Sequence, residues 1–124
     1  MNIRSFKELI VWQCAMDSAM DIFRLTEDLP SRERFSLTDQ IRRSSRSVAA
    51  NIAEAWRKRR YPAALVAKLS DAEAEAAETH THVEIARRCA YFNDATAASL
   101  DKEYEEILAM LVAMEAKPNQ WVIR

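Results

Sequence analysis

The sequence predicts an all-α protein: a single domain over residues 1–124, folded as an antiparallel up-down-up-down four-helix bundle. Three observations lead to this fold class. The chain contains no glycine, the residue that supplies positive φ in the tight turns of β-hairpins. Its three prolines fall between long segments whose apolar residues recur every three or four positions. The composition, 49% hydrophobic and 30% charged, is that of an ordinary globular domain.

The first helix is expected over about residues 6–28, and it carries two lines of apolar residues. One line has the spacing of a packed seam and consists of Leu9, Trp12, Met16, Ala19 and Phe23. The other points away from it and consists of Val11, Ala15, Ile22, Leu25 and Leu29. A helix that is apolar on two sides is usually covered on two sides. We therefore expect Val11, Ala15, Ile22 and Leu25 to form an interface between subunits.

The second helix is expected over about residues 37–59, after a polar stretch that follows Pro30. Ser36 is a candidate N-cap, with Asp39 as a short version of the acid of a capping box. Asn51 lies at the edge of the apolar seam, where a polar group either fixes the register of packing or reaches a ligand, and we favour register. The seam consists of Leu37, Ile41, Ser45, Val48, Ile52 and Ala55.

The third and fourth helices are expected over about residues 62–91 and 94–116. Pro62 suits the first turn of a helix, and Asn93 or Asp94 caps the next one. The third helix has the most regular seam of the chain, made of Leu65, Leu69, Ala72, Ala76, Thr79, Val83, Ala86 and Ala90. The fourth has Ala97, Leu100, Tyr104, Ile107, Leu111 and Met114. Short loops between long helices favour the up-down order.

No arrangement of residues predicts catalysis, a cofactor or a small-molecule substrate. A di-metal centre in a helical bundle needs Glu-x-x-His pairs, and the sequence has none. His80 and His82 lie on different sides of their helix, so we expect surface or interface histidines, with metal ligation through Glu78/His82 or His80/Glu84 as the alternative. Phosphate-binding loops need glycine. Cys14 and Cys89 suit buried or interfacial thiols. We expect a protein that is not an enzyme.

The net charge of −1 gives no overall attraction for phosphate, so any nucleic-acid binding must depend on a local patch. Such a patch lies on the second helix, where Arg42, Arg46, Arg57 and Arg60 form a stripe flanked by Arg43, Lys58 and Arg59. Antiparallel pairing with the third helix would place Arg46 near Glu75 and Arg43 near Glu78. Salt bridges between helices or between subunits are therefore the alternative for the first half of the stripe.

The second half of the stripe, Arg57 to Arg60, faces no matching acids on the third helix, where Lys68 adds positive charge. Trp56 and Tyr61 flank it, so RNA or DNA would meet both cations and aromatic rings there. The alternative is a solvated helix end whose cations complement the helix dipole. The chain has no long apolar run or signal peptide, so we expect no membrane contact and a cytoplasmic location.

A set of motifs resembles the four-helix-bundle family encoded in intervening sequences of bacterial 23S ribosomal RNA genes. The second helix supplies Ser36-Leu37-Thr38-Asp39-Gln40-Ile41-Arg42-Arg43 and Asn51-Ile52-Ala53-Glu54. Further matches are Phe6-x-x-Leu9-x-Val11-Trp12-Gln13, Leu29-Pro30, Leu69-Ser70-x-Ala72, Glu78-Thr79 and Ile85-Ala86. Two places depart from the family pattern: Ala55 stands where glycine is usual, and Glu73-Ala74-Glu75 where Arg-Gly-Ser is usual.

This resemblance implies a homo-oligomer, with a pentamer favoured, and no known biochemical role. The family is similar to the accessory variability proteins of diversity-generating retroelements, which form pentameric barrels and engage nucleic acid. From residues and resemblance together we expect a non-enzymatic, homo-oligomeric helical scaffold that binds RNA or DNA through Arg57, Lys58, Arg59, Arg60, Arg42 and Arg46. The alternative is a protein-protein interaction scaffold with no nucleic-acid ligand.

Overall fold

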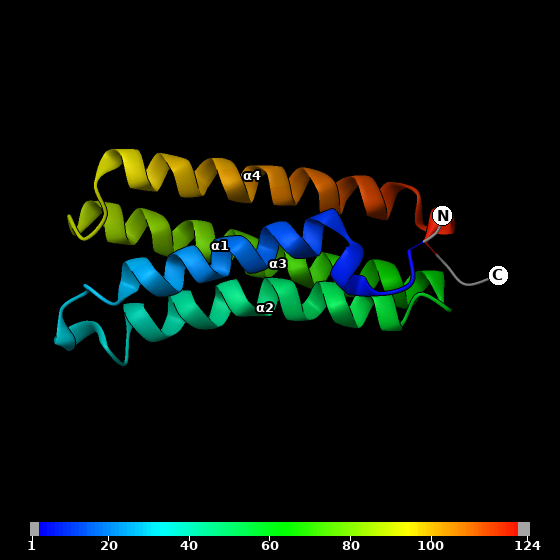
Figure 1. The fold of residues 1–124 in the computed structure, drawn as a ribbon, viewed down its shortest axis with the longest axis horizontal. Helices are drawn as coiled ribbons and strands as arrows, with labels where there is room; N and C mark the ends of the chain where they lie inside the picture. Colours follow the sequence, from blue (N-terminus) through cyan, green and yellow to red (C-terminus); the bar gives the residue numbers. More distant parts are fainter. Residues whose placement is uncertain (1–2, 122–124) are drawn as a thin grey trace.

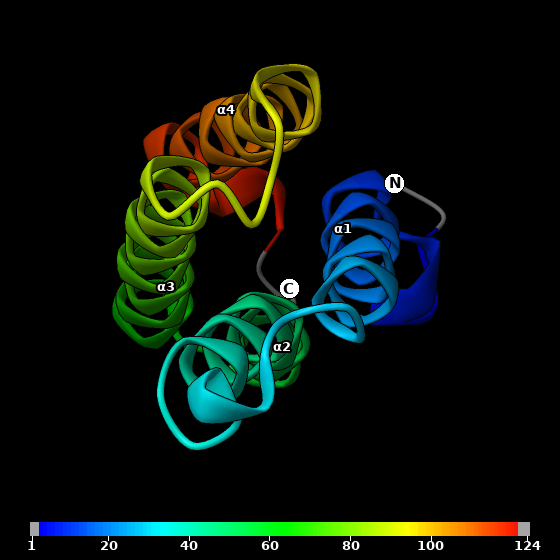
Figure 2. The same cartoon turned by 90° about the vertical axis from the view of Figure 1, so that its left-hand side faces the viewer.

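The computed structural model describes residues 3–121, and its architecture is four long α-helices. Successive helices run in opposite directions along one axis (Figure 1), and seen end-on they surround a common core in the order α1, α2, α3, α4 (Figure 2). The all-α four-helix fold predicted from the sequence is confirmed. The helices are α1 (Ile10–Thr26), α2 (Leu37–Arg57), α3 (Pro62–Arg88) and α4 (Asp94–Ala116).

The core is built from the seams that the apolar spacing predicts for α2, α3 and α4. Every residue of the predicted α2 and α4 seams is buried, and so is every residue of the α3 seam except Ala90. Small residues let α2 and α3 approach closely at their middle, where the hydroxyls of Ser44 and Thr79 lie 2.9 Å apart and fully buried. This contact and the ion pair between Glu54 and Lys68 confirm the antiparallel register expected for α2 and α3.

The face of α1 that packs on the core is the one that the sequence analysis placed outside. Val11 is 3% exposed, and Ala15 and Ile22 are fully buried in the core of the single chain. The prediction that they form a subunit interface is therefore wrong, because they have no surface left to offer another subunit. Leu25 is half-buried against the same core. Of the other line, Leu9 and Ala19 are buried as well, whereas Trp12, Met16 and Phe23 are half-buried, and Phe23 contacts Arg42 of α2.

The first helix also starts later than predicted, at Ile10 in place of residue 6. Residues Phe6–Glu8 form a separate 3-10 turn with a capping box between Ser5 and Glu8. Leu9 is extended, with φ −70° and ψ 126°, which breaks the helical path between the turn and α1. The Phe6 ring packs edge-on against the Trp12 ring, with the centroids 5.3 Å apart. Local capping thus replaces the first helical turn.

Glu33, and not the Ser36 hydroxyl, supplies the side-chain cap at the start of α2. Ser36 occupies the N-cap position, but its hydroxyl donates a 2.6 Å hydrogen bond to the Glu33 carboxylate. The same carboxylate oxygen accepts the backbone N–H of Leu37 at 3.4 Å. The other oxygen accepts the Tyr91 hydroxyl at 2.9 Å, which ties the α1–α2 loop to the turn after α3. At α4 the predicted cap is confirmed, since Asn93 accepts the Thr96 N–H at 2.7 Å.

Candidate nucleic-acid interface

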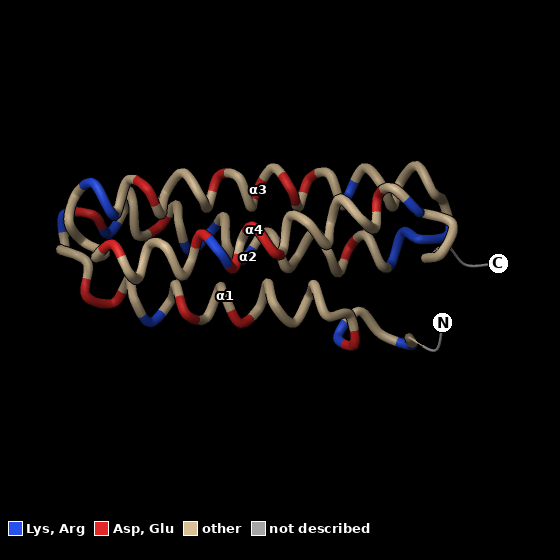
Figure 3. The backbone as a smooth tube through the Cα atoms, turned by 90° about the horizontal axis from the view of Figure 1, so that it is seen from above, with Lys and Arg blue, Asp and Glu red and all other residues tan. Residues whose placement is uncertain are grey.

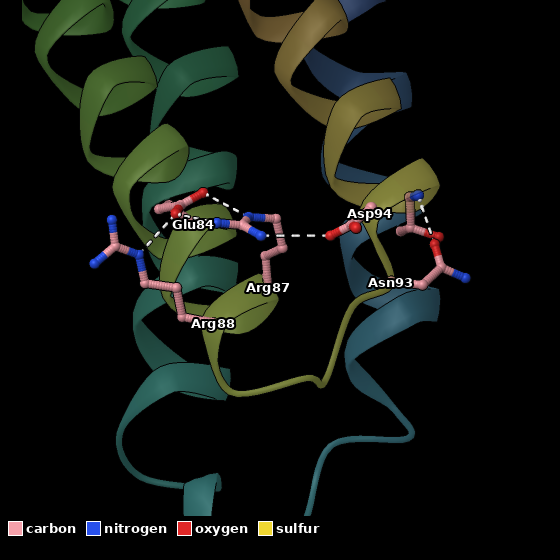
Figure 4. A network of polar contacts seen from close by, with 6 residues as sticks. Glu84, Arg87, Arg88, Asn93 and Asp94 are labelled. Atoms are coloured by element: carbon pink, nitrogen blue, oxygen red, sulfur yellow. Dashed lines mark hydrogen bonds and ion pairs between the residues drawn. The ribbon is translucent and has the colours of Figure 1, made fainter.

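In the described part of the chain, the arginines at the end of α3 form ion pairs with acids, whereas those on α2 do not. Along the bundle, the acids are spread over α1, α3 and α4, and many cations gather towards the two ends (Figure 3). On α3, Glu84 pairs with Arg87 at 2.8 Å and with Arg88 at 2.8 Å, and Arg87 also reaches Asp94 (Figure 4). These two guanidinium groups lower the pKa of Glu84 to about 2. The cations at this end of α3 are therefore already paired.

Within residues 3–121, no arginine on α2 forms an ion pair with an acid. Arg43, Arg46, Arg57 and Arg60 are exposed, as is Lys58. The interhelical salt bridges predicted from Arg46 to Glu75 and from Arg43 to Glu78 are absent from the ion pairs of these described residues. The predicted antiparallel register is confirmed, but Arg42 and Arg46 contact Phe23 of α1, and Arg43 lies exposed to solvent.

Arg42 is the member of the stripe that is used to hold the fold together. Its Nε donates to the Thr26 hydroxyl at 2.8 Å, and its terminal nitrogen donates to the Phe23 carbonyl at 3.2 Å. The guanidinium carbon lies 4.7 Å from the centre of the Phe23 ring. Arg46 approaches the same ring at 6.0 Å but keeps its charged end exposed. Arg42 therefore links α2 to α1, while Arg46 remains free to meet a ligand.

The second half of the stripe, at the end of α2, offers one aromatic ring where the sequence analysis expected two. Trp56 is only 6% exposed, and the Arg59 guanidinium covers its ring at 3.9 Å and donates to its carbonyl at 2.8 Å. Burial and the nearby Arg57 lower the pKa of Arg59. Tyr61, in contrast, is 65% exposed. Tyr61 borders a shallow hollow of about 460 Å³ at this end of α2. The other residues that line the hollow are Arg57, Lys58, Arg60 and Ala64.

Lys68 does not extend this basic cluster, contrary to what the sequence suggested. Its ammonium group lies 2.7 Å from the Glu54 carboxylate and 3.8 Å from Asp71. The hydrogen bond to Glu54 raises the pKa of Lys68 and lowers that of Glu54. Asn51 bonds within its own helix, to Ser47, and meets Lys68 at 3.5 Å. The free charge at this end of the molecule therefore belongs to α2 and to the turn that follows it.

At the other end of α2 lies a second basic hollow that the sequence analysis did not identify. It measures about 470 Å³ and contains Arg34 and Phe35, two residues of the loop that precedes the helix. The sequence signal was present, because Phe35 directly follows the charged residues Arg32, Glu33 and Arg34 in a polar stretch. It was missed because the helical spacing that groups the arginines does not extend into a loop. The remaining residues of the hollow are Thr38, Asp39, Arg42, Arg43 and Arg46.

The histidines are more buried than the sequence analysis expected. His82 is 8% exposed and lies 3.7 Å from Glu78. His80 lies 3.0 Å from Asp101 and 3.4 Å from Glu105, both on α4. Across residues 3–121, no group of three His, Cys, Asp or Glu side chains has the arrangement of a metal site. The structure thus brings each histidine to carboxylates without assembling a set of metal ligands.

The two thiols lie in different environments. Cys14 is half-buried between α1 and α4, where burial and the carboxylates of Asp17, Glu106 and Glu103 raise its pKa. A thiol with a raised pKa carries little thiolate and is a poor nucleophile. Cys89 follows the last residue of α3 and is exposed, so of the two expected settings, buried or interfacial, it is not buried within this chain.

A largely apolar groove of about 530 Å³ runs between the start of α1 and the end of α4. Ile10 projects into it from α1 and is 69% exposed, and Met110 borders it from α4. Trp121 closes one end and is half-buried against the core. No helix among the described residues has both the length and the apolar character needed to cross a membrane.

The comparisons with known proteins agree with the resemblance seen in the motifs. The family model described as 23S rRNA-intervening sequence protein matches residues 7–113. A crystal structure of a protein of unknown function from the S23 ribosomal protein family of Bacteroides thetaiotaomicron is similar to this chain, with a TM-score of 0.75 and 27% sequence identity. The match covers 86% of this chain and 98% of that one. No curated protein matches.

Proposed function

The chain belongs to the family of 23S rRNA-intervening sequence proteins, and from this premise we propose that it is a non-enzymatic, homo-oligomeric scaffold that binds RNA or DNA through α2. The observation that carries the proposal is a set of exposed cations on α2 and the turn after it that form no ion pair within residues 3–121: Arg43, Arg46, Arg57, Lys58 and Arg60. When these cations neutralise phosphate groups, the nucleic acid releases its bound counterions. This release favours binding most strongly at low salt.

Catalysis forms no part of the proposal, and the placement of the nucleophilic side chains supports this. Ser44 and Ser45 are fully buried and donate to backbone carbonyls of their own helix. Cys14 has a raised pKa beside three acids. None of these groups has both a base to activate it and access to a substrate.

Binding to nucleic acid is tested by the salt dependence of affinity. Wild-type protein should lower the electrophoretic mobility of a labelled RNA hairpin at about 50 mM salt and lose most of its affinity by about 200 mM. Replacing Arg43 and Arg46 by alanine should lower the slope of log affinity against log salt by about one unit for each phosphate that the protein no longer neutralises. The affinity should fall for all sequences alike, since phosphate contacts carry no sequence information.

The matched control is the pair Arg87→Ala and Arg88→Ala, which removes the same charge from two arginines already paired with Glu84. This variant should keep the wild-type salt slope. Equal reductions of affinity in the two double variants would mean that net charge, and not the α2 surface, determines binding. A mobility unchanged by wild-type protein at low salt would refute the proposal.

The subunit interface of the proposed oligomer must lie elsewhere than on Ala15 and Ile22, which are fully buried in the core. The apolar groove between α1 and α4 is the surface that a second copy would cover, because association would shield Ile10 and its neighbours from water. The family resemblance favours a pentamer. Such a ring needs a head-to-tail interface, in which two different surfaces of neighbouring copies meet.

Light scattering coupled to size-exclusion chromatography tests the assembly. The wild-type chain should elute as an oligomer, and Ile10→Glu should shift it towards the monomer, since a charge in an apolar interface has no partner. Ile85→Glu introduces the same charge at an exposed position of α3 and should leave the assembly intact. A wild-type monomer at micromolar concentration would exclude the oligomer.

A protein-protein interaction scaffold with no nucleic-acid ligand is the second candidate, and the same groove favours it. Its apolar lining would accept another protein as well as a second copy. This second candidate is supported if the wild-type chain is monomeric and does not bind RNA or DNA at low salt. It is excluded if the Arg43 and Arg46 variant alone loses nucleic-acid affinity.

A further inference from the structure

Phe35 is an apolar ring that the fold holds in solvent beside several arginines. It is 87% exposed, the highest value among the large hydrophobic residues of the described chain. The ring has no hydroxyl or ring N–H that would compensate for its contact with water. Covering such a ring with the face of a ligand removes its apolar surface from water, which favours binding.

The backbone on either side of Phe35 is fixed by hydrogen bonds. The N–H of Arg34 donates to the Ser31 carbonyl at 3.1 Å, and the N–H of Ser36 donates to the Glu33 carbonyl at 3.0 Å. The Glu33 side chain accepts the hydroxyls of Ser36 and Tyr91, at 2.6 Å and 2.9 Å. The ring therefore projects from a segment that is tied both to α2 and to the turn after α3.

The ring shares its hollow with four arginines. The guanidinium carbon of Arg34 lies 5.4 Å from the ring centre, in the range of a cation–π contact. Arg42, Arg43 and Arg46 line the same hollow, against one acid, Asp39. Arg42 is engaged with α1, whereas Arg34, Arg43 and Arg46 are all exposed and have no ion pair within residues 3–121.

We propose that this hollow binds single-stranded RNA or DNA, with one unpaired base stacked on Phe35 and the neighbouring phosphates on Arg34, Arg43 and Arg46. The inference rests on the proposed function and narrows it to a nucleic-acid form and a place. In a duplex the faces of the bases are covered by their neighbours, so the ring has nothing to stack on. In a single strand every base has a free face, and the guanidinium groups lie where its backbone would pass.

Fluorescence anisotropy with a short labelled oligouridylate, and with an RNA duplex of the same length, tests the proposal. The wild-type protein should bind the single strand more tightly than the duplex at equal salt. Phe35→Ala should weaken single-strand binding about tenfold, because it removes the stacking of one base. The same change should leave duplex binding and the salt slope unchanged. Phe35→Trp should retain single-strand binding.

Tyr61→Ala is the matched control, since it removes an exposed aromatic ring from the other basic hollow. It should leave the affinity for the oligouridylate within about twofold of wild type. Because Phe35 is almost fully exposed, its alanine variant should also keep the wild-type melting curve, which separates a loss of binding from a loss of folding.

The outcomes separate this inference from the proposed function. Tighter binding to the duplex, or an unchanged affinity in Phe35→Ala, overturns the stacking site and leaves binding through α2 intact. A loss of affinity confined to Tyr61→Ala moves the site to the other end of α2 and also overturns the inference. The absence of binding to either probe at low salt overturns both.

Discussion

Ala90 shows how one residue ends α3 and sends the chain towards α4. Its φ of 63° lies in the left-handed region, the only such residue described in the chain. With this conformation the N–H groups of Tyr91 and Phe92 both reach the Ala86 carbonyl, at 2.9 Å and 3.2 Å, and Phe92 is buried. Glycine commonly takes this role, because an alanine side chain crowds the backbone there.

Replacing Ala90 by glycine should raise the free energy of unfolding by about 1 kcal/mol. The change removes the strain of a left-handed alanine, about 1–2 kcal/mol, and part of that gain is offset by the greater freedom of glycine in the unfolded chain. Urea unfolding followed by circular dichroism measures the difference. Ala77→Gly, at an exposed position inside α3, should instead lower stability by about 1 kcal/mol. Equal destabilisation of both variants would show that Ala90 is unstrained.

At the scale of single residues, sequence reasoning located the arginines of α2 but not their contacts. It grouped Arg42 with Arg46 correctly on one side of the helix, yet only the structure shows that Arg42 is bonded to Thr26 and Phe23. It also expected Trp56 to be available, whereas Arg59 covers it. These differences have one cause: the contacts of a side chain depend on which residues the fold places beside it, and spacing along the sequence does not show them.

At the scale of elements, α1 is the helix whose packing the sequence left ambiguous. It has two apolar lines, and helical spacing gives no reason to prefer either one. The structure buries Val11, Ala15 and Ile22 and places the bulkier Trp12 and Phe23 at the flank. The larger rings of Trp12 and Phe23 are left half-buried, where they pack against Phe6 and Arg42. The other three helices each have one clear seam, and there the prediction is confirmed.

The contact between α2 and α3 contains a buried pair of hydroxyls whose contribution is measurable. The oxygens of Ser44 and Thr79 lie 2.9 Å apart, and each also meets a backbone carbonyl of its own helix, that of Ile41 and that of Glu75. Thr79→Val should destabilise the fold by about 1 kcal/mol, because it removes the hydrogen bond that joins the two helices. Ser44→Ala should cost a similar amount.

The double variant tests whether the two hydroxyls act together. It should be less destabilised than the sum of the single variants, by about 0.5–1 kcal/mol, as expected for groups in contact. Thr81→Val removes an exposed hydroxyl that bonds only to Ala77 of its own helix, and it should change stability by less than about 0.5 kcal/mol. Strict additivity in denaturant unfolding would show that the contact contributes nothing.

At the scale of the whole molecule, charge is distributed unevenly around the bundle, and acids meet acids along both flanks of α4. Glu115 approaches Glu73 of α3, and burial together with a hydrogen bond to Glu73 raises the pKa of Glu115 to about 7. Glu103 approaches Asp21 of α1, where burial and the charge of Asp21 also raise its pKa. In each pair, partial burial beside another carboxylate disfavours the ionised form of the α4 glutamate.

The fold should therefore lose stability as the pH rises through neutrality. The Glu115 contribution is fully present below the unfolded pKa near 4.5 and disappears as the pH passes its folded value of about 7. Glu115→Gln should match wild type at about pH 5 and exceed it at about pH 8, by on the order of 1 kcal/mol after allowance for solvent screening. Thermal unfolding across this range measures the effect.

Glu27→Gln removes the same charge from an exposed position after α1 and is the control. It should keep the pH dependence of the wild-type protein. Below this range, as the pH falls under the ordinary glutamate pKa of 4.5, the sign reverses for Glu33, Glu54 and Glu84, whose lowered pKa values contribute stability that is lost as they become protonated. A wild-type stability that stays constant between about pH 5 and pH 8 would contradict the raised pKa of Glu115.

The sequence by itself determined the four helices, their antiparallel register and the buried faces of α2, α3 and α4. Those features depend on spacing along the chain, which is a local property. Tertiary structure decided which face of α1 enters the core, which arginines remain unpaired, and that Phe35 projects into solvent beside them. Those features depend on which neighbour each flank of a helix meets, and that choice is made only when all four helices pack around one core.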